Sequence, residues 1–595
     1  MKSNYNKFPY VEVKNVGEDD SFEDIKEIIR VLEKHIKNGV KTIVMDFYPG
    51  VIVEDVKNDL ISKLNADIEI FSDDEIFEDN ETITNRIAYL MTDDRVFGKM
   101  NNHMLEDFVI AENLKKAQEK VLNSNGLVIV YGVGASLVTK GEIYLYFDMA
   151  RWEIQLRYRS ALIPNWKYDN YVDDALKKYK RGYFFEWRIA DRHKRDNFDN
   201  FDYVVDTNKR GEYRMISGNA FRKGLVEATR RPIRVVPFFD PGVWGGQWMK
   251  EVCDLDRSQK NFAWCFDCVP EEESLLLKVN DVMVEIPSQD VCLYKPIDFM
   301  GIQNYQRFAF DFPIRFDFLD TIKGQNLSLQ VHPIFDYIKD KFGMAYTQEE
   351  SYYILDTDEE NDKNYVYLGL KNNVNPEEMI DELRKAARGE KRFEDEKFVN
   401  KFEAHKHDHF LIPPGTIHCS GAGTMVLEIS TNAYIFTFKL WDWGRLGLDG
   451  LPRPLNVEHG KYNIQFYRDT DFCKRELVNN ISIIKEEEGN KEEKTGLHEL
   501  EFIETRRNWF SKPVLHKTYG EVNVLNLVEG REALVTSPKN EFEPFVVHYA
   551  ETFIVPAGVD EYIIQPYGES EGEKIATLKA FVRNTAIYSS FKNNL

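Results

Sequence analysis

The pattern of apolar residues changes at about Pro232, and this change constrains the fold more than any other feature of the chain. Up to about Arg230, short apolar runs alternate with longer, charged stretches of helical spacing. Strands that alternate with helices indicate a parallel α/β sheet. After Pro232, short apolar runs are separated by Gly and Pro turns, which is typical of β-barrels and sandwiches. With 595 residues, we expect two to four domains of at least two different classes.

The first region divides into individual elements. We predict strands over 41–47, 126–131, 141–148 and 201–206, and helices over 55–64, 149–161 and 220–230. This order resembles the uridine-kinase type of P-loop domain. A working phosphate loop needs Lys and Ser/Thr after its glycines, but Val53 and Glu54 stand in those places, and Glu54 would repel phosphate. The second glycine turn, Gly132–Ser136, also lacks a Lys. We therefore predict a P-loop-like domain without kinase activity.

One alternative for this domain stays open. The basic segment 177–195 corresponds to a kinase lid and could bind an anion. The competing interpretation is a charged helix exposed to solvent.

Composition excludes several functions. The net charge of −23 disfavours nucleic-acid binding and association with anionic membranes, both of which need a positive face. The N-terminal residues have no apolar signal region, and no run is long enough to span a bilayer. Six cysteines in so long a chain do not form a disulfide framework, and the single CxxC, Cys265–Cys268, does not close a zinc site. We expect a cytoplasmic protein with no nucleic-acid or membrane partner.

The run Asn326–Pro333 carries the first candidate site residues. Apolar and polar residues alternate in it with the period of a β-strand, so Gln330 and His332 share one face. An amide oxygen and an imidazole form half of a metal site, and Glu350 and His418 are candidates for the other half. Spacing alone fits a solvated strand face at least as well.

The sequence around these residues resembles that of type I mannose-6-phosphate isomerases, which are zinc-dependent cupin enzymes. The similar motifs occur in chain order and are Val243–Gly246, Phe312–Asp320, Leu327–Pro333, Glu350–Tyr353, Pro413–Gly423, Val426–Ile429 and Lys439–Arg445. The resemblance extends from about Pro232 to the C-terminus.

The resemblance implies an aldose–ketose isomerase that interconverts mannose 6-phosphate and fructose 6-phosphate through a cis-enediol. It implies one Zn²⁺ per chain, with Gln330, His332, Glu350 and His418 as ligands. An open metal position would stabilise the charge that develops on the sugar oxygens. Lys439 stands where better-known members have an Arg near the sugar, and is the catalytic candidate. Glu428 is either a partner that orients a ligand imidazole or a surface carboxylate.

Two further departures from the family pattern concern the substrate. Asp317 and Gln348 stand where many members have Lys. Replacement charge could come from three cations, namely Arg315, Arg445 and Lys461. Two alternatives therefore stay open: a metal-binding cupin that acts as a sugar-binding or regulatory protein, and an isomerase for a different sugar.

The expected fold is multidomain: an N-terminal α/β P-loop-like parallel sheet over 1–230, then a β-rich double cupin of jelly-roll barrels. The first barrel, 231–475, would hold the metal and carry a helical insert at about 376–398. The second, 476–595, would be metal-free because no His follows the Gly of its turn at 553–561. We expect an exposed loop over 485–494. His405, His407 and His409 are expected to be solvated edge residues rather than ligands.

Overall fold

The computed structural model describes residues 3–583, apart from 362, 433, 434, 449, 451, 452, 497, 499 and 500. The chain forms two compact units. The α/β unit consists of Tyr10–Ala228 and Pro270–Lys295, and the β unit of Met1–Pro9, Thr229–Val269 and Pro296–Leu595. The chain thus returns to the α/β unit once after leaving it, which the sequence pattern did not indicate.

The α/β unit is built on a seven-stranded sheet in the order β2-β8-β7-β6-β3-β5-β4. Its strands are β2 (Ser21–Phe22), β3 (Thr42–Phe47), β4 (Ile68–Phe71), β5 (Val128–Gly132), β6 (Ile143–Asp148), β7 (Tyr203–Asp206) and β8 (Arg214–Ser217). Strands β4, β5, β3, β6 and β7 are parallel, whereas β8 and β2 add an antiparallel edge. The prediction of a parallel sheet is therefore correct for the centre and wrong for this edge.

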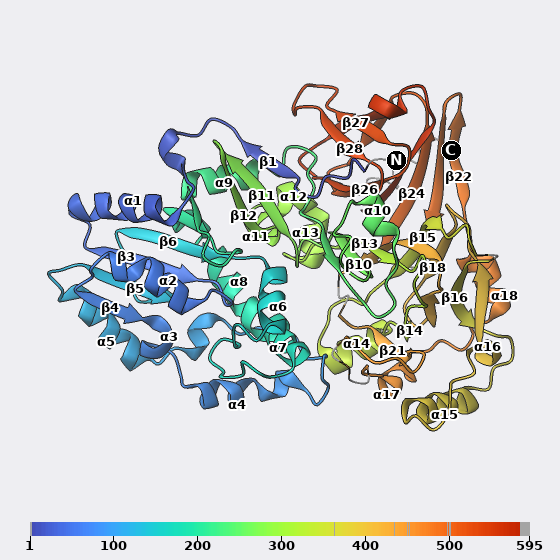
Figure 1. Ribbon diagram of the computed structural model, residues 1–595, viewed down its shortest axis with the longest axis horizontal. Helices are drawn as coiled ribbons and strands as arrows, with labels where there is room; N and C mark the ends of the chain where they lie inside the picture. Colours follow the sequence, from blue (N-terminus) through green and yellow to red (C-terminus); the bar gives the residue numbers. More distant parts are fainter. Residues whose placement is uncertain are drawn as a thin grey trace. The chain divides into compact units, whose positions relative to one another are not determined.

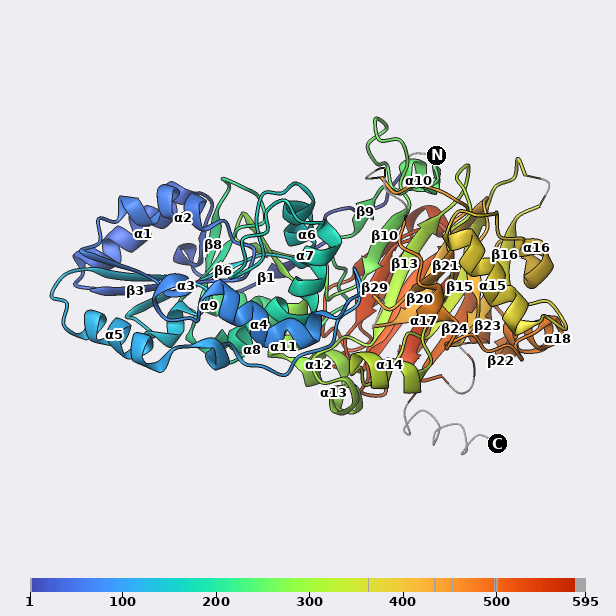
Figure 2. The same ribbon diagram turned by 90° about the horizontal axis from the view of Figure 1, so that it is seen from below.

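Helices cover both faces of this sheet (Figure 2). The helices in the first segment of this unit are α1 (Ile25–Lys37), α2 (Val53–Asp59), α3 (Ser72–Glu75), α4 (Asn80–Met91), α5 (Ala111–Leu122), α6 (Arg151–Arg159), α7 (Ala175–Arg181), α8 (Trp187–Arg195) and α9 (Gly218–Glu227). Because both faces are covered, the central strands are continuous apolar runs, and every residue of β5 and β6 is buried. This continuity is why the sequence located those strands.

The second segment of the α/β unit is a β-hairpin and a short helix. Strands β11 (Ser274–Val279) and β12 (Val282–Pro287) are antiparallel, and β11 pairs in parallel with β1 (Tyr10–Val13). Helix α11 (Gln289–Tyr294) follows. The pairing of β1 with β11 joins residues that are more than 260 positions apart.

The β unit contains four sheets, all with antiparallel pairing (Figure 1). The first two have the orders β18-β15-β20-β13-β10-β9 and β17-β16-β19-β14-β21. Their strands are β9 (Phe238–Asp240), β10 (Trp264–Cys268), β13 (Ile314–Asp320), β14 (Leu329–Val331), β15 (Glu350–Thr357), β16 (Tyr365–Leu370), β17 (Val399–Glu403), β18 (His409–Ile412), β19 (His418–Ser420), β20 (Thr424–Thr431) and β21 (Phe438–Trp441).

The other two sheets have the orders β22-β23-β24-β31-β26-β29 and β25-β30-β27-β28. Their strands are β22 (Ser482–Glu487), β23 (Asn490–Gly496), β24 (Ile503–Phe510), β25 (Val514–Lys517), β26 (Asn523–Glu529), β27 (Glu532–Thr536), β28 (Phe545–His548), β29 (Thr552–Val555), β30 (Glu561–Pro566) and β31 (Ile575–Val582). The exposed loop predicted over 485–494 is wrong, because β22 and β23 form a hairpin there. Residues 584–595, at the end of the expected second barrel, lie outside the described residues.

Helices of the β unit lie in the connections between strands. They are α10 (Trp248–Val252), α12 (Pro296–Met300), α13 (Ile302–Phe308), α14 (Phe335–Phe342), α15 (Pro376–Ala387), α16 (Asp395–Phe398), α17 (Val457–Gly460) and α18 (Thr470–Phe472). The predicted helical insert corresponds to α15 and α16. Helix α15 begins there because Asn375 caps it and Pro376 occupies its first turn. Within the described residues, no helix combines the length and apolar character that crossing a membrane requires.

Candidate functional site

The candidate site is built on β14, β15 and β19 of the β unit. Figure 1 labels β14 and β15. In the antiparallel register, Gln330 on β14 lies opposite His418 on β19 on one side and opposite Lys439 on β21 on the other. Residues directly opposite one another in such a ladder point to the same face. His332 follows immediately after β14, and Glu350 is the first residue of β15. The strand ladders therefore bring together residues that are far apart in sequence.

His332, Glu350 and His418 form a buried triad that could hold a metal ion, since one ligand atom from each lies within 4.8 Å of the others. His418 Nε2 is 3.4 Å from Glu350 Oε1, and His332 Nε2 contacts Glu350 Oε2. Apart from these two contacts, neither His332 Nε2 nor Glu350 Oε1 has a hydrogen-bond partner among the described residues. Gln330 Nε2 lies 3.3 Å from His418 Nε2.

The charge of Glu350 is strongly stabilised. Burial alone raises the pKa of this carboxyl, but the imidazoles of His332 and His418 outweigh burial and hold the pKa well below its usual value. The amide of Gln348 also donates to Glu350 Oε2, at 3.2 Å. A buried anion with two imidazole nitrogens directed at it has the donor chemistry that zinc and similar cations require.

Backbone carbonyls orient the two imidazoles. His418 Nδ1 lies 2.9 Å from the carbonyl oxygen of Thr416, and His332 Nδ1 lies 3.4 Å from that of Phe436. A carbonyl can only accept, so each Nδ1–H is directed at its carbonyl and each Nε2 at the site. A backbone carbonyl has no sequence signal, so sequence reasoning missed both partners and named Glu428 instead.

Two more carboxyls and an arginine lie beside the triad. Across β13 and β20, Asp317 pairs with Glu428 and Arg315 with Ser430, which in turn lies opposite Glu350. Arg315 contacts the carboxylate of Asp317 and donates to Ser430 Oγ at 3.2 Å. Burial, opposed by Arg315, raises the pKa of Asp317 to about 7. Burial, and then the Glu350 carboxylate, raises the pKa of Glu428 well above its usual value.

Several expectations about polar residues are corrected by this arrangement. Glu428 is buried and accepts from Ser430 at 3.0 Å, so it is not a surface carboxylate. His409 is fully buried with Nε2 2.9 Å from Ser351 Oγ, so it is not a solvated edge residue.

Two of the possible replacement cations pair with carboxylates elsewhere. Arg445 pairs with Asp442, and Lys461 lies 2.6 Å from Glu458.

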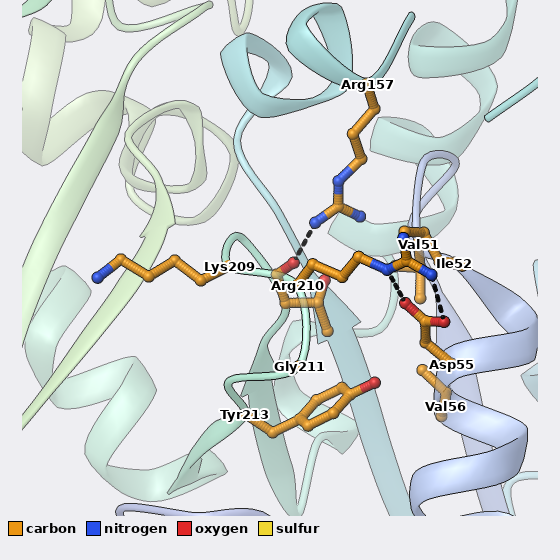
Figure 3. Close-up of a pocket in the computed structure, with 10 residues that line it drawn as sticks. Val51, Ile52, Asp55, Val56, Arg157, Lys209, Arg210, Gly211 and Tyr213 are labelled. Carbon is orange, nitrogen blue, oxygen red and sulfur yellow. Dashed lines mark hydrogen bonds and ion pairs between the residues drawn. The ribbon is translucent and has the colours of Figure 1, made fainter. Parts of the chain in front are cut away.

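In the α/β unit, polar residues gather at the carboxyl ends of the parallel strands, where open α/β sheets bind ligands. A recess of about 220 Å³, part of it open to solvent, lies there (Figure 3). It is lined by Val51, Ile52, Asp55, Val56, Arg157, Thr207, Lys209, Arg210, Gly211 and Tyr213. Arg157 donates to the carbonyls of Gly50 and Thr207 at 3.0 and 2.6 Å, and Arg210 forms an ion pair with Asp55.

Other cations of this unit are buried in ion pairs. Lys194 contacts both Asp148 and Asp290, and Arg151 contacts Asp191 and Glu271. The interpretation of 177–195 as a solvent-exposed helix is therefore wrong, because its basic residues include fully buried ones, among them Lys178 and Lys194. The segment forms α7 and α8, joined by one wider helical turn.

A carboxylate of the sheet occupies the second glycine turn. Asp46, near the end of β3, accepts the N–H of Gly134 at 2.8 Å and the hydroxyl of Ser136 at 2.6 Å. Its Oδ2 also lies 2.9 Å from His193 Nε2. The pKa of Asp46 is lowered, since the effects of His193 and the hydroxyl donors exceed that of burial.

Comparison with known proteins gives a distant relationship for part of the chain. A family model described as a domain of unknown function (DUF8485) matches residues 24–230. The chain is 23% identical over 237 residues to mannose-6-phosphate isomerase ManA of Bacillus subtilis (strain 168), covering 39% of this chain and 67% of that protein. It is 27% identical over 231 residues to the probable mannose-6-phosphate isomerase GmuF of the same organism, covering 38% and 66%. The chain is thus distantly similar to mannose-6-phosphate isomerases and spans about two thirds of their length.

Solved structures give matches of the same kind. The crystal structure of mannose 6-phosphate isomerase from Bacillus subtilis matches with a TM-score of 0.45 and 16% identity, over 59% of this chain and 99% of that one. A putative mannosephosphate isomerase from Archaeoglobus fulgidus matches with a TM-score of 0.43 and 19% identity, over 58% and 98%.

Proposed function

We propose that this protein is a metal-dependent aldose–ketose isomerase of the cupin type that interconverts mannose 6-phosphate and fructose 6-phosphate. The observation that carries the proposal is the buried triad of His332, Glu350 and His418. The substrate pair is proposed from the distant similarity of the chain to proteins named mannose-6-phosphate isomerases.

The donor set fits one zinc ion per chain. Atoms about 2.0–2.1 Å from a tetrahedral zinc lie about 3.3 Å from each other. The spacings of 3.4 Å between His418 and Glu350, and of 3.3 Å between Gln330 and His418, are close to that value, whereas His332 Nε2 lies nearer than that to Glu350 Oε2. Because the oxygen and nitrogen of an amide exchange places when it turns over, Gln330 can present its oxygen as the fourth ligand. Zinc bound there would supply Lewis acidity toward the carbonyl and hydroxyl oxygens of an open-chain sugar.

The protein's own residues hold and orient the reactants in this proposal. Lys439, opposite Gln330 in the strand register, would supply an ammonium group to a sugar oxygen that gains negative charge. Unlike arginine, lysine offers a point charge and not a planar fork, so it stabilises one oxygen instead of gripping two. Gln348, by donating to Glu350, fixes the carboxylate in its orientation.

The test is a metal analysis of the purified full chain combined with an assay for fructose 6-phosphate formation from mannose 6-phosphate. We expect about one zinc per chain and activity that is lost on chelation and restored by zinc. The double variant Gln330→Ala, His332→Ala should lose both. Isomerisation that persists in the double variant would show that the reaction occurs elsewhere.

A different sugar is the second candidate substrate, and the observation that favours it is the pairing of Arg315. Arg315 forms an ion pair with Asp317 and a hydrogen bond with Ser430, and these contacts compete with binding of a phosphate group. A panel of phosphorylated and unphosphorylated aldoses, assayed with the zinc-loaded protein, distinguishes the two candidates. Ligand binding without turnover of any sugar would instead favour a sugar-binding regulatory protein.

For the rest of the chain, we propose the domain types expected from the sequence, with residues 270–295 assigned to the α/β unit and residues 1–9 to the β unit. The α/β unit would be P-loop-like without kinase activity, since Glu54 and Asp55 lie in the first turn of α2 and Asp46 occupies the glycine turn. Nucleotide titration of the full chain tests this, and clear ATP hydrolysis would contradict it. The second barrel, over 476–595, would be metal-free, which agrees with the apolar residues that fill its interior, among them Phe510, Leu527 and Ile564.

A further inference from the structure

The turn that precedes His418 connects to both histidines of the triad. The N–H of Gly415 donates to the carbonyl of His332 at 2.9 Å. The carbonyl of the next residue, Thr416, accepts from His418 Nδ1 at 2.9 Å. The placement of this one turn therefore affects the direction of both imidazoles.

The backbone of this turn has an unusual conformation at Gly415. Gly415 has φ of 86°, a conformation that L side chains rarely adopt, and a Cβ there would lie 2.6 Å from the carbonyl oxygen of Asn463. The oxygens of the turn also receive hydrogen bonds from a side chain of a neighbouring segment.

Arg468 supplies those contacts. Its Nη1 lies 2.6 Å from each of the carbonyl oxygens of Pro413 and Pro414 and 2.5 Å from Thr416 Oγ1. Two protons on this nitrogen are shared among three oxygens, and the Thr416 hydroxyl itself donates to Pro413 at 2.6 Å. Charge-assisted hydrogen bonds of this kind are stronger than neutral ones.

The backbone of Arg468 is held in turn by its neighbours. Its N–H donates to the carbonyl of Gln465 at 3.0 Å, and its carbonyl accepts from Leu370 at 3.0 Å. Gln465 also donates through its N–H to the carbonyl of Gly415 at 2.9 Å. The segment 465–468 thus supports the turn at two points, with a backbone that is anchored to β16.

We propose that Arg468 is a positioning residue for the metal site: it fixes the 413–416 turn so that His332 and His418 present Nε2 to one point. This inference rests on the proposed function, because it assigns the purpose of the triad to metal binding. Arg468 acts through the turn and touches neither the metal nor the sugar.

The test is the divalent-metal affinity of Arg468→Met in the full chain, measured with zinc against a chromophoric chelator. We expect affinity to fall by about 10- to 100-fold, the usual effect of losing a group that orients a ligand. The visible absorption of the cobalt-loaded protein should also change, since it reports ligand geometry. Arg468→Lys, which keeps the charge but not the fork, should recover part of the affinity.

Two further variants separate positioning from folding. Arg475→Met removes an exposed arginine, seven residues after Arg468, that pairs with Glu476, so the metal affinity of this variant should equal that of the wild type. Thr416→Val removes only the hydroxyl of the network and should weaken zinc binding by a few fold. It also provides the test should Arg468→Met fail to fold.

Two results overturn the inference in distinguishable ways. If the wild type binds zinc and both Arg468→Met and Thr416→Val bind it equally well, the positioning role is wrong and the proposed function stands. If the wild type itself binds no divalent metal, the proposed function is wrong and the positioning role is wrong with it.

Discussion

A cluster of buried charges in the α/β unit and another in the β unit differ in how their members are paired. In the α/β unit, Lys194 is buried against the carboxylates of Asp148 and Asp290. In the β unit, His332 Nε2 and Glu350 Oε1 are buried and directed at a common point, yet neither has a hydrogen-bond partner among the described residues. Buried polar atoms without partners are costly unless something else satisfies them. We therefore interpret a buried ion pair as a structural contact, and buried ligand atoms that converge without hydrogen-bond partners as a binding site.

The largest effect we expect concerns the return of the chain to the α/β unit. A fragment that ends at residue 230 lacks β11, the partner of β1, and also lacks Glu271 and Asp290. Two buried cations would lose a carboxylate, which is strongly destabilising. We expect no cooperative unfolding transition by circular dichroism for this fragment, and recovery of one when residues 270–295 are supplied. A fragment 1–230 as stable as the full chain would contradict this role for the hairpin.

Breaking one closed ion-pair cluster should cost less. Lys194→Met leaves Asp148 and Asp290 buried together without their cation, and such a loss typically costs about 3–5 kcal/mol. The measurement is the free energy of unfolding in urea. Lys177→Met, which changes an exposed lysine on α7, is the control and should stay within about 0.5 kcal/mol of wild type. Equal free energies of unfolding for Lys194→Met and Lys177→Met would contradict a stabilising role for the cluster.

The matching change in the β unit should affect binding most. Glu350→Gln removes the negative charge of the triad, and we expect zinc affinity to fall by more than about 100-fold, the upper value for residues that only orient ligands. The metal-free variant should also lose some stability in urea, because the imidazoles of His332 and His418 stabilise the wild-type carboxylate. Glu403→Gln, on the exposed part of β17, is the control. Unchanged zinc affinity in Glu350→Gln would argue against the triad as the metal site.

The smallest expected effects are opposite pH dependences. Burial, and then Glu285, raises the pKa of Asp206 in the α/β unit to about 7. The native state therefore keeps a proton on Asp206 that the unfolded chain releases near pH 4. The contribution of Asp206 to the free energy of unfolding is complete below about pH 4 and is lost as the pH rises toward 7. Burial, and then Arg507, lowers the pKa of His409 in the β unit to about 3. Its stability contribution is present above about pH 6.5 and lost as the pH falls.

Calorimetry of Asp206→Asn and His409→Gln between pH 4 and 7 measures these two contributions. Asp206→Asn should lose less stability than the wild type as the pH rises from 4 to 7. His409→Gln should lose less stability than the wild type as the pH falls from 7 to 4. Identical pH slopes in wild type and variants would mean that neither group titrates differently in the native and unfolded states.

Sequence reasoning succeeded where local pattern and burial agree. The strands predicted over 41–47 and 141–148 correspond to β3 and β6, because strands covered on both faces are continuous apolar runs. The helical insert predicted at about 376–398 corresponds to α15 and α16, and Asn375 and Pro376 form the start of α15. Predictions from charge were less successful, because a basic run has the same composition on a surface as in buried ion pairs. Segment 177–195, predicted as a solvent-exposed helix, is partly buried.

By itself, the sequence determined that the chain has an α/β part and a β part, and that Gln330 and His332 share a strand face. Tertiary structure alone decided that His418, 88 positions after Gln330, lies opposite it, and that Arg468 holds the turn between the two histidines. It also decided that residues 270–295 complete the α/β unit. The physical reason is that alternation along a strand is local, whereas strand register and ion pairing depend on which distant segments the folded chain brings into contact.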